Sequence, residues 1–349
     1  MSPVVRTPVP SPACTLAAGL LAALAIVPLP GHRTLAGEPQ AARATASATR
    51  WTMPRTPDGR PDLQGTWTHN AITPLERPKQ LAEKSELTDE EFAELQVRVN
   101  EVLDGGDAIF LDDLMTAALM GNKAFRSTDR NTGNYSQVWL SDRVLEKRTS
   151  LIVDPSNGRI PALTQEAQAR NAARAAARRA NPPSEFEALG ATTRCITMGV
   201  PSLWAGYNSY FEFVQSPDHV VLRMEMIHDA RIIPIDGRPH LPDRLRQLHG
   251  DSRGRWDGDT LVVETRNFSP RSNFRGSNEN LHLVERFTRI DADTIDYLMT
   301  LSDPTTWVQP WTILVKLRRS DEPIHEYACH EGNRGMEGIL SAQRAAEAR

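Results

Sequence analysis

The stretch HEYACHEGN, residues 325 to 333, places two histidines, two glutamates and a cysteine within nine positions near the end of the chain. Such a set could bind a metal or transfer protons. If the stretch is a strand, His325 and His330 face opposite sides, because side chains alternate along a strand. A metal site needs donors that converge on one point, so this stretch alone predicts none. A site that adds a distant histidine to His330 or Glu331 is the alternative.

The stretch MIHDAR offers acid–base chemistry instead. His228 is predicted to move a proton as general base or acid, and Asp229 to orient its imidazole. We expect Arg231, His325 or Glu326 to polarise the substrate oxygen. The competing interpretation is an ion-paired turn with a structural histidine.

Strands are expected to position these residues, because the chain after residue 205 is a succession of short apolar segments separated by turns. The predicted strands are 210–216, 219–236, 259–268, 281–291, 294–303 and 311–320. Connections this short cannot join parallel strands. We therefore expect a mainly β (α+β) fold in which an antiparallel meander forms a barrel or a sandwich.

Alternation along these strands predicts which side chains line the interior. In one predicted strand, Met224, Met226 and His228 share a mostly apolar face, and in another Glu285 does so. A buried ionisable group is costly unless it is paired, so His228 and Glu285 are the informative members. We expect an apolar cavity whose ligand-binding residues are Tyr207, Tyr210, Met224, Met226 and Glu285.

Helical patterns interrupt the chain before these strands, in two insertions at about 85–125 and 163–181, which we expect to pack outside the sheet. In the second insertion, Arg170, Arg174 and Arg178 recur every fourth residue. We interpret this stripe as a solvated face rather than an anion site, because the alanines around it offer little else to bind with.

The N-terminus has the layout of a secretory signal, residues 1–37, with Arg6 ahead of an apolar run and small residues after it. The run is too short for a permanent membrane span, and an uncleaved anchor is the alternative. Residues 38–50 are predicted to be a linker and 51–349 a single β-rich domain. We expect an exported protein, periplasmic or extracellular, without a transmembrane segment in its mature chain.

Two cysteines remain after such a signal is removed, Cys195 and Cys329, because Cys14 precedes the apolar run. In an oxidising compartment they are predicted to form a disulfide, with two free thiols as the alternative. The formal net charge of −4 argues against a nucleic-acid partner. No dinucleotide-binding, P-loop or haem-attachment motif is present, so we expect no cofactor.

Two parts of the sequence resemble known families. The sequence QGTW, residues 64 to 67, resembles the Gly-x-Trp of the first strand of lipocalin-like barrels, which implies that Trp67 closes one end of a barrel under a basic residue such as Arg318 or Arg319. The long helical insertion departs from that plan. Longer blocks, among them GDSRGRWDGDTLVVETRNF and HEYACHEGN, resemble those of a family of exported bacterial proteins without an assigned activity. That resemblance implies a compartment and no reaction.

Two functions are compatible with these observations. The first is a cofactor-free acid–base enzyme, a lyase, isomerase or hydrolase, that acts on a small hydrophobic molecule in the cavity. The alternative is a non-catalytic envelope protein that binds a hydrophobic ligand or partner, since methionines form adaptable apolar walls. A sheet protein without any pocket is the plainest possibility.

Overall fold

The computed structural model describes residues 51–104, 111–121, 143–180, 189–203, 205–272 and 274–348. The predicted signal and linker lie outside the described residues, as does part of the first helical insertion. The division into domains stays a prediction.

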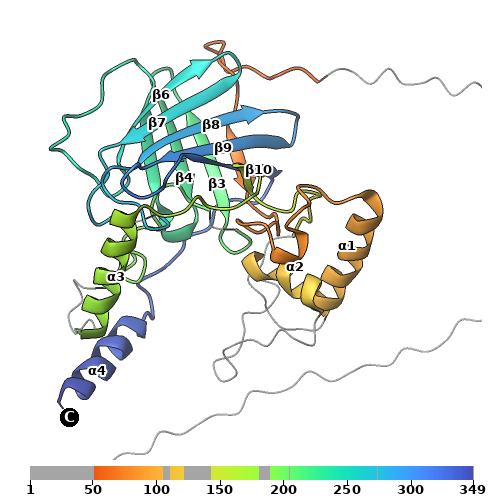
Figure 1. Cartoon of the computed structure of the whole chain (residues 1–349). Helices are drawn as coiled ribbons and strands as arrows, with labels where there is room; N and C mark the ends of the chain where they lie inside the picture. The colour runs from red at the N-terminus through yellow and green to blue at the C-terminus, as the bar shows by residue number, and fades with distance from the viewer. Residues whose placement is uncertain are drawn as a thin grey trace, which may run out of the picture. The chain divides into compact units, whose positions relative to one another are not determined.

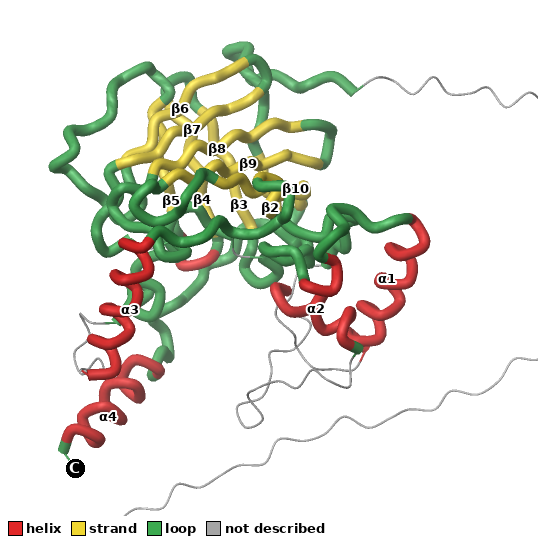
Figure 2. Tube along the Cα trace, in the orientation of Figure 1, coloured by secondary structure: helices red, strands yellow, loops and turns green. Residues whose placement is uncertain are grey.

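Ten strands form one sheet in the described part of the chain, and all paired neighbours are antiparallel (Figure 2). They are β1 (Gly65–Thr68), β2 (Ile152–Asp154), β3 (Tyr210–Gln215), β4 (His219–Met224), β5 (Ala230–Pro234), β6 (Asp251–Asp257), β7 (Thr260–Arg266), β8 (His282–Arg289), β9 (Thr294–Ser302) and β10 (Trp311–Ser320). Their order is β5-β4-β3-β1-β10-β9-β8-β7-β6, with β2 beside β10. The predicted antiparallel, mainly β fold is confirmed.

The two edge strands, β5 and β6, approach each other through side chains, and no backbone hydrogen bonds close the sheet between them. Gly254 on β6 permits this approach. A methyl group on its Cα would lie 2.6 Å from Cγ2 of Ile235 and 3.1 Å from Cγ2 of Ile233. A larger residue there would push the edges apart. The sheet is therefore strongly curved but open along one seam.

Aromatic side chains fill the space that the curved sheet encloses. Phe213 on β3 meets Phe287 on β8, a strand far from it in the sheet, with ring centroids 5.2 Å apart. Phe287 also stacks on Tyr297 of β9 at 4.3 Å. All three rings are almost fully buried. The interior is thus a packed core, where a ligand cavity was expected from the sequence.

Trp67 on β1 is fully buried, and its indole nitrogen donates a hydrogen bond to the carbonyl of Leu63. The guanidinium of Arg319 lies 5.9 Å from the centre of its ring, as the Gly-x-Trp resemblance implies. A second arginine, Arg289, lies closer, at 5.2 Å. Cations over an indole face are attracted by the ring quadrupole. The guanidinium groups of these two arginines therefore stabilise the buried position of Trp67.

In the part of the chain that the structure describes, four α-helices lie outside the sheet (Figure 1). They are α1 (Asp89–Asp104), α2 (Leu111–Met120), α3 (Gln165–Ala180) and α4 (Gly335–Glu347). The first three lie within the predicted helical insertions. Thr88 and Glu91 begin α1 with a reciprocal capping box, and α1 shares a small apolar core with α2. Helix α4, which buries no residue, was not predicted from the sequence. Within the described residues, no helix is long and apolar enough to cross a membrane.

The predicted strand 219–236 is wrong, because the chain reverses in its middle to form the β4–β5 hairpin. Ile227 and His228 both have left-handed backbone conformations, with φ of 56° and 46°. The amide of Met224 donates to the carbonyl of Asp229 across the turn. Alternation therefore stops at Met224, and the shared face predicted for Met224, Met226 and His228 does not exist. Both methionines are buried, whereas His228 is exposed.

Candidate functional site

The predicted acid–base set is divided between two places. Arg231 points into the packed core, where it forms a two-pronged ion pair with Glu285, at 3.0 and 2.6 Å. Asp229, in the turn before β5, is hydrogen-bonded instead to Thr197 and to the amide of Met198. His228 is exposed beside them. The predicted acid–base set of His228, Asp229 and Arg231 is therefore not assembled at one site.

The ion pair in the core is sealed from solvent. The side chains of Arg231 and Glu285 are 4% and 0% exposed. Arg231 also donates to the hydroxyls of Ser252 and Thr265, and Tyr297 donates to Glu285. Burial, aided by the neighbouring Glu285 carboxylate, raises the pKa of Tyr297 well above its usual value. The predicted burial of Glu285 is confirmed, but this cluster offers no opening for a ligand.

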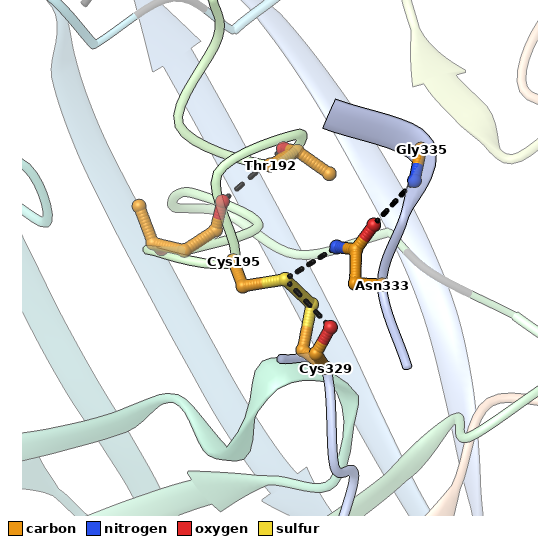
Figure 3. The surroundings of a disulfide bond; sticks show 6 residues. Thr192, Cys195, Cys329, Asn333 and Gly335 are labelled. Carbon is orange, nitrogen blue, oxygen red and sulfur yellow. Dashed lines mark hydrogen bonds between the residues drawn. A yellow bond between two sulfur atoms is a disulfide. The ribbon is translucent and has the colours of Figure 1, made fainter. Parts of the chain in front are cut away.

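The segment around HEYACHEGN is a loop rather than a strand, and His325 and Glu326 are exposed on it. Its cysteine has a clear role, because Cys329 forms the predicted disulfide with Cys195 (Figure 3). Asn333 donates a hydrogen bond to the sulfur of Cys195. The bridge joins residues 134 positions apart, so it fixes the C-terminal loop to the segment that leads into β3.

A cavity of about 760 Å³ lies beside α3, outside the core of the sheet. One face of α3 forms one side of it. The other sides come from the segment that contains Cys195, from Leu248, and from the loop between β7 and β8. Its described lining residues are Asn171, Arg174, Ala175, Ala177, Gly190, Ala191, Thr192, Thr197, Met198, Gly199, Val200, Leu248, Phe268, Pro270, Arg271, Ser272, Phe274, Ser277, Asn278 and Leu281.

The predicted ligand-binding residues lie elsewhere. Tyr207 and Tyr210 are half-buried, and Met224 and Met226 are buried. None of the four, nor Glu285, is among the described lining residues of this cavity. The reason is geometric: their predicted positions assumed a hollow sheet, and the sheet is filled.

Among the described lining residues of the cavity, both charged side chains are arginines. Arg174 on α3 and Arg271 on the β7–β8 loop are exposed, and neither has an ion-pair partner among the described residues. None of the described lining residues is acidic. Phe268, Phe274 and Leu281 supply apolar walls, and Phe274 stacks on Trp311 of the core. The cavity therefore combines an apolar surface with two cations that have no ion-pair partner among the described residues.

The basic stripe of α3, interpreted as a solvated face, is solvated at Arg174 but not at Arg170. Arg170 donates hydrogen bonds to the hydroxyl of Thr306 at 2.8 Å and to nearby carbonyls, so it anchors the helix. Arg174, one turn further along, lines the cavity. The side chain of Arg178 lies outside the described residues. The four-residue repeat of the arginines did not show which side of α3 packs against the rest of the protein.

Polar residues from three segments meet at Thr197, and Thr197 alone of the three is among the described lining residues of the cavity. The hydroxyl of Thr197 donates to Oδ2 of Asp229 at 2.7 Å and lies 2.5 Å from Nε2 of His249. His249 Nε2 is also 3.5 Å from Oδ1 of Asp229. Thr197 and Asp229 are buried, and the side chain of His249 is 24% exposed. We call Thr197, Asp229 and His249 the polar cluster.

Gly250 fixes His249 in this position. Its φ is +68°, and a methyl group on its Cα would lie 2.7 Å from Cγ2 of Thr265 and 2.8 Å from the carbonyl oxygen of Arg266. Only glycine allows this backbone to pack so closely on β7. His249 was missed from the sequence because its partners are 20 and 52 positions away. No short motif connects them.

Within the described ranges, no three or more His, Cys, Asp and Glu side chains come together as a possible metal site.

Comparisons with known proteins do not assign a family. No family model matches the chain, and no curated protein matches it. Among solved structures, a crystal structure of a mutant of the fluorescent protein UnaG is similar over 32% of this chain and 72% of its own, with 13% identity and a TM-score of 0.21. A likeness this low supports no argument about the site. The lipocalin-like character and the exported family both stay predictions.

Proposed function

We propose that the protein binds a small amphipathic anion in the cavity beside α3. The observation that carries this proposal is the pair Arg174 and Arg271, which have no ion-pair partner among the described residues and line a cavity whose described lining contains no acid. Arginine holds carboxylates and similar anions through two parallel N–H donors. An anion bound here would supply the missing negative charge.

The rest of the lining defines the other end of the ligand. Phe268, Phe274 and Leu281 present apolar surface, and the cavity volume falls within the range of sites for small molecules. Asn171 and Ser272 add neutral hydrogen-bonding groups. A molecule with an apolar or aromatic body and an acidic head fits this combination better than the fully hydrophobic ligand expected from the sequence.

Export to the periplasm or the cell exterior belongs to the same proposal. The disulfide between Cys195 and Cys329 supports it, because disulfides persist mainly in oxidising compartments.

The acid–base enzyme expected from the sequence has less support in its original form. Of its predicted catalytic residues, only Asp229 is hydrogen-bonded to residues that line the cavity, among the described contacts. Binding is therefore the function that the geometry supports first.

Two fluorescent probes with nearly the same aromatic body test this function. Anilinonaphthalene sulfonate has the acidic head, and phenylnaphthylamine lacks it. We expect the double variant Arg174→Gln/Arg271→Gln to bind the sulfonate at least about tenfold more weakly, because two charge-assisted contacts are lost. Binding of the neutral probe should not change. Titrations followed by fluorescence measure both affinities.

A matched control removes the same charge from the outer face of the sheet. Arg223 and Arg286 are exposed there and are paired with Glu212 and Asp257. If Arg223→Gln/Arg286→Gln weakens sulfonate binding as much as the cavity variant does, the attraction is general and the proposed site is wrong.

A further inference from the structure

We propose that the cavity beside α3 selects an acid with an amide N–H next to its carboxylate, and that Asn171 recognises this N–H. The ligand class is an N-acylated amino acid with an apolar side chain, a chemistry that the carboxyl end of a peptide shares. This inference rests on the proposed anion binding and adds a specificity-determining residue to it.

The neutral polar side chains of the cavity differ in how many hydrogen-bonding groups they have left. The hydroxyl of Thr197 is fully used within the polar cluster and by the amide of Gly199. Asn278 uses both ends of its side-chain amide, because Nδ2 donates to Thr305 and Oδ1 accepts the backbone N–H of Asn280. Both side chains therefore stabilise the wall of the cavity.

The other hydroxyl groups of the lining are also bonded to the protein. Thr192 and Ser272 donate their hydroxyl protons to backbone carbonyls. Ser277, which is almost fully buried, accepts the backbone N–H of Phe274. These hydroxyls hold the backbone around the cavity in place.

Asn171 is different, because its side-chain amide has no hydrogen-bond partner among the described residues. It is half-buried and lines the cavity from α3. Its Nδ2 faces the loop between β7 and β8, where a methyl group added to Gly276 would lie 3.6 Å away. An amide in this position is hydrated, so a ligand that displaces the water must supply the hydrogen bonds that the water made.

The chemistry of Asn171 specifies its counterpart on the ligand. A carboxamide presents an acceptor, Oδ1, beside a donor, Nδ2. In an extended amino-acid residue the N–H and the carbonyl oxygen point to the same side, as they do in the hydrogen-bonded pairs of an antiparallel sheet. Oδ1 of Asn171 would accept the ligand N–H, and Nδ2 would donate to a carboxylate oxygen.

The spacing along α3 fits this pairing. Asn171 and Arg174 both line the cavity, and residues three positions apart on a helix have Cβ atoms about 5–6 Å apart on one face. A single carbon separates the N–H and the carboxylate of an N-acylated amino acid. Its carboxylate can therefore lie against the arginines while its N–H meets Asn171.

The charge and the size of the cavity favour the acylated form of the amino acid. A free amino acid would bring an ammonium group towards Arg174 and Arg271, and none of the described lining residues is acidic. An acyl group removes that charge and keeps the N–H. The volume of about 760 Å³ has room for it beside an apolar side chain.

Two ligands that differ only at this N–H test the inference. N-acetylphenylalanine has it, and O-acetyl-3-phenyllactate has an oxygen in its place. We expect the full-length protein to bind the amide about tenfold more tightly, because the ester leaves Oδ1 of Asn171 without a donor. In Asn171→Leu the two ligands should bind within about twofold of each other. Displacement of anilinonaphthalene sulfonate measures each affinity.

A second variant keeps this test specific. Leucine is similar in size to asparagine and favours a helix, so Asn171→Leu should leave α3 intact. Asn100→Leu is the matched control, because Asn100 is exposed on α1 and is not among the described lining residues. It should keep the preference for the amide. Equal binding of both ligands to the natural protein, or a preference that survives in Asn171→Leu, would overturn the role of Asn171.

Two further ligands define the class. Phenylalanine itself should bind at least about tenfold more weakly than its N-acetyl form, because its ammonium group meets two cations. Equal or tighter binding of phenylalanine would contradict the acylated class. An acetylated tetrapeptide of three alanines and a final phenylalanine distinguishes the sources. Binding at least as tight as that of N-acetylphenylalanine assigns the site to the carboxyl end of a peptide, and weaker binding assigns it to a small conjugate.

The outcomes distinguish this inference from the proposed function. If N-acetylphenylalanine displaces the sulfonate without any preference over the ester, the role of Asn171 is wrong and anion binding stands. If N-acetylphenylalanine does not displace the sulfonate, the inferred ligand class is wrong. If the sulfonate itself binds without dependence on Arg174 and Arg271, both proposals fail.

Discussion

Charged side chains are paired and buried in the packed interior of the sheet, but exposed at the cavity beside α3. In the interior, Arg231 is bound to Glu285, and the pair is closed off from solvent. At the cavity, Arg174 and Arg271 remain exposed and have no ion-pair partner among the described residues. A buried charge must be paired because its hydration is lost. An exposed charge keeps its hydration, so it can stay unpaired until a ligand binds. Charge in the interior therefore specifies structure, and charge at the cavity is available for binding.

The strongest test of this contrast is Glu285→Gln. It leaves the guanidinium of Arg231 buried beside a neutral partner, which we expect to lower the free energy of unfolding by about 3–5 kcal/mol. Urea unfolding measures the loss. Arg286→Gln is the control at the adjacent position, because Arg286 is 42% exposed, and its effect should stay within about 0.5 kcal/mol. A similar loss in both variants would remove the distinction between sealed and open charges.

A second test concerns the covalent tie beside the cavity. Cys195 lies between two groups of lining residues, 190–192 and 197–200, so the disulfide holds that wall in place. We expect Cys195→Ser/Cys329→Ser to lower the free energy of unfolding by about 2–4 kcal/mol. It should also weaken sulfonate binding under conditions where the protein is still folded. Unchanged affinity would show that the cavity wall does not depend on the bridge.

The smallest expected effect is a change in alkaline stability. The pKa of Tyr297 is raised by burial, and further by Glu285, from an ordinary value of 10.0. A group with a raised folded-state pKa stabilises the protein fully below its unfolded-state pKa. That contribution is lost as the pH rises above about 10 towards the folded-state value.

Spectrophotometric titration should therefore show one tyrosine of the five that ionises only on unfolding. In Tyr297→Phe this late step should be missing, and the alkaline decline in stability should be shallower. A late step that persists in Tyr297→Phe would assign it to another tyrosine, and the interior would then not be sealed as described.

Much of the framework was predictable from local patterns. The segments β3, β7, β8, β9 and β10 coincide with predicted strands, and α1 and α3 with predicted helices. The burial of Glu285 followed from simple alternation along β8. The same rule failed at the β4–β5 hairpin, because it cannot detect a reversal that uses left-handed residues other than glycine, such as Ile227 and His228.

The candidate site was much less predictable. His249, Thr197 and Asp229 come from three separate segments, and each is an ordinary residue in its own neighbourhood. Arg174 was noticed as part of a stripe, but the pattern contained no information about what α3 packs against. The loop between β7 and β8, which provides Arg271 and Phe274, has no periodicity that would place it near that helix.

The amino-acid sequence by itself determined which segments are strands and helices, which strand face is apolar, and which two cysteines could pair. Those properties depend on residues a few positions apart, whose spacing follows directly from the geometry of a helix or a strand. Only the tertiary structure decided that the sheet is filled, that Arg231 meets Glu285, and that the open cavity lies beside α3. These outcomes depend on how side chains from distant segments share a limited volume, and no local spacing records that competition.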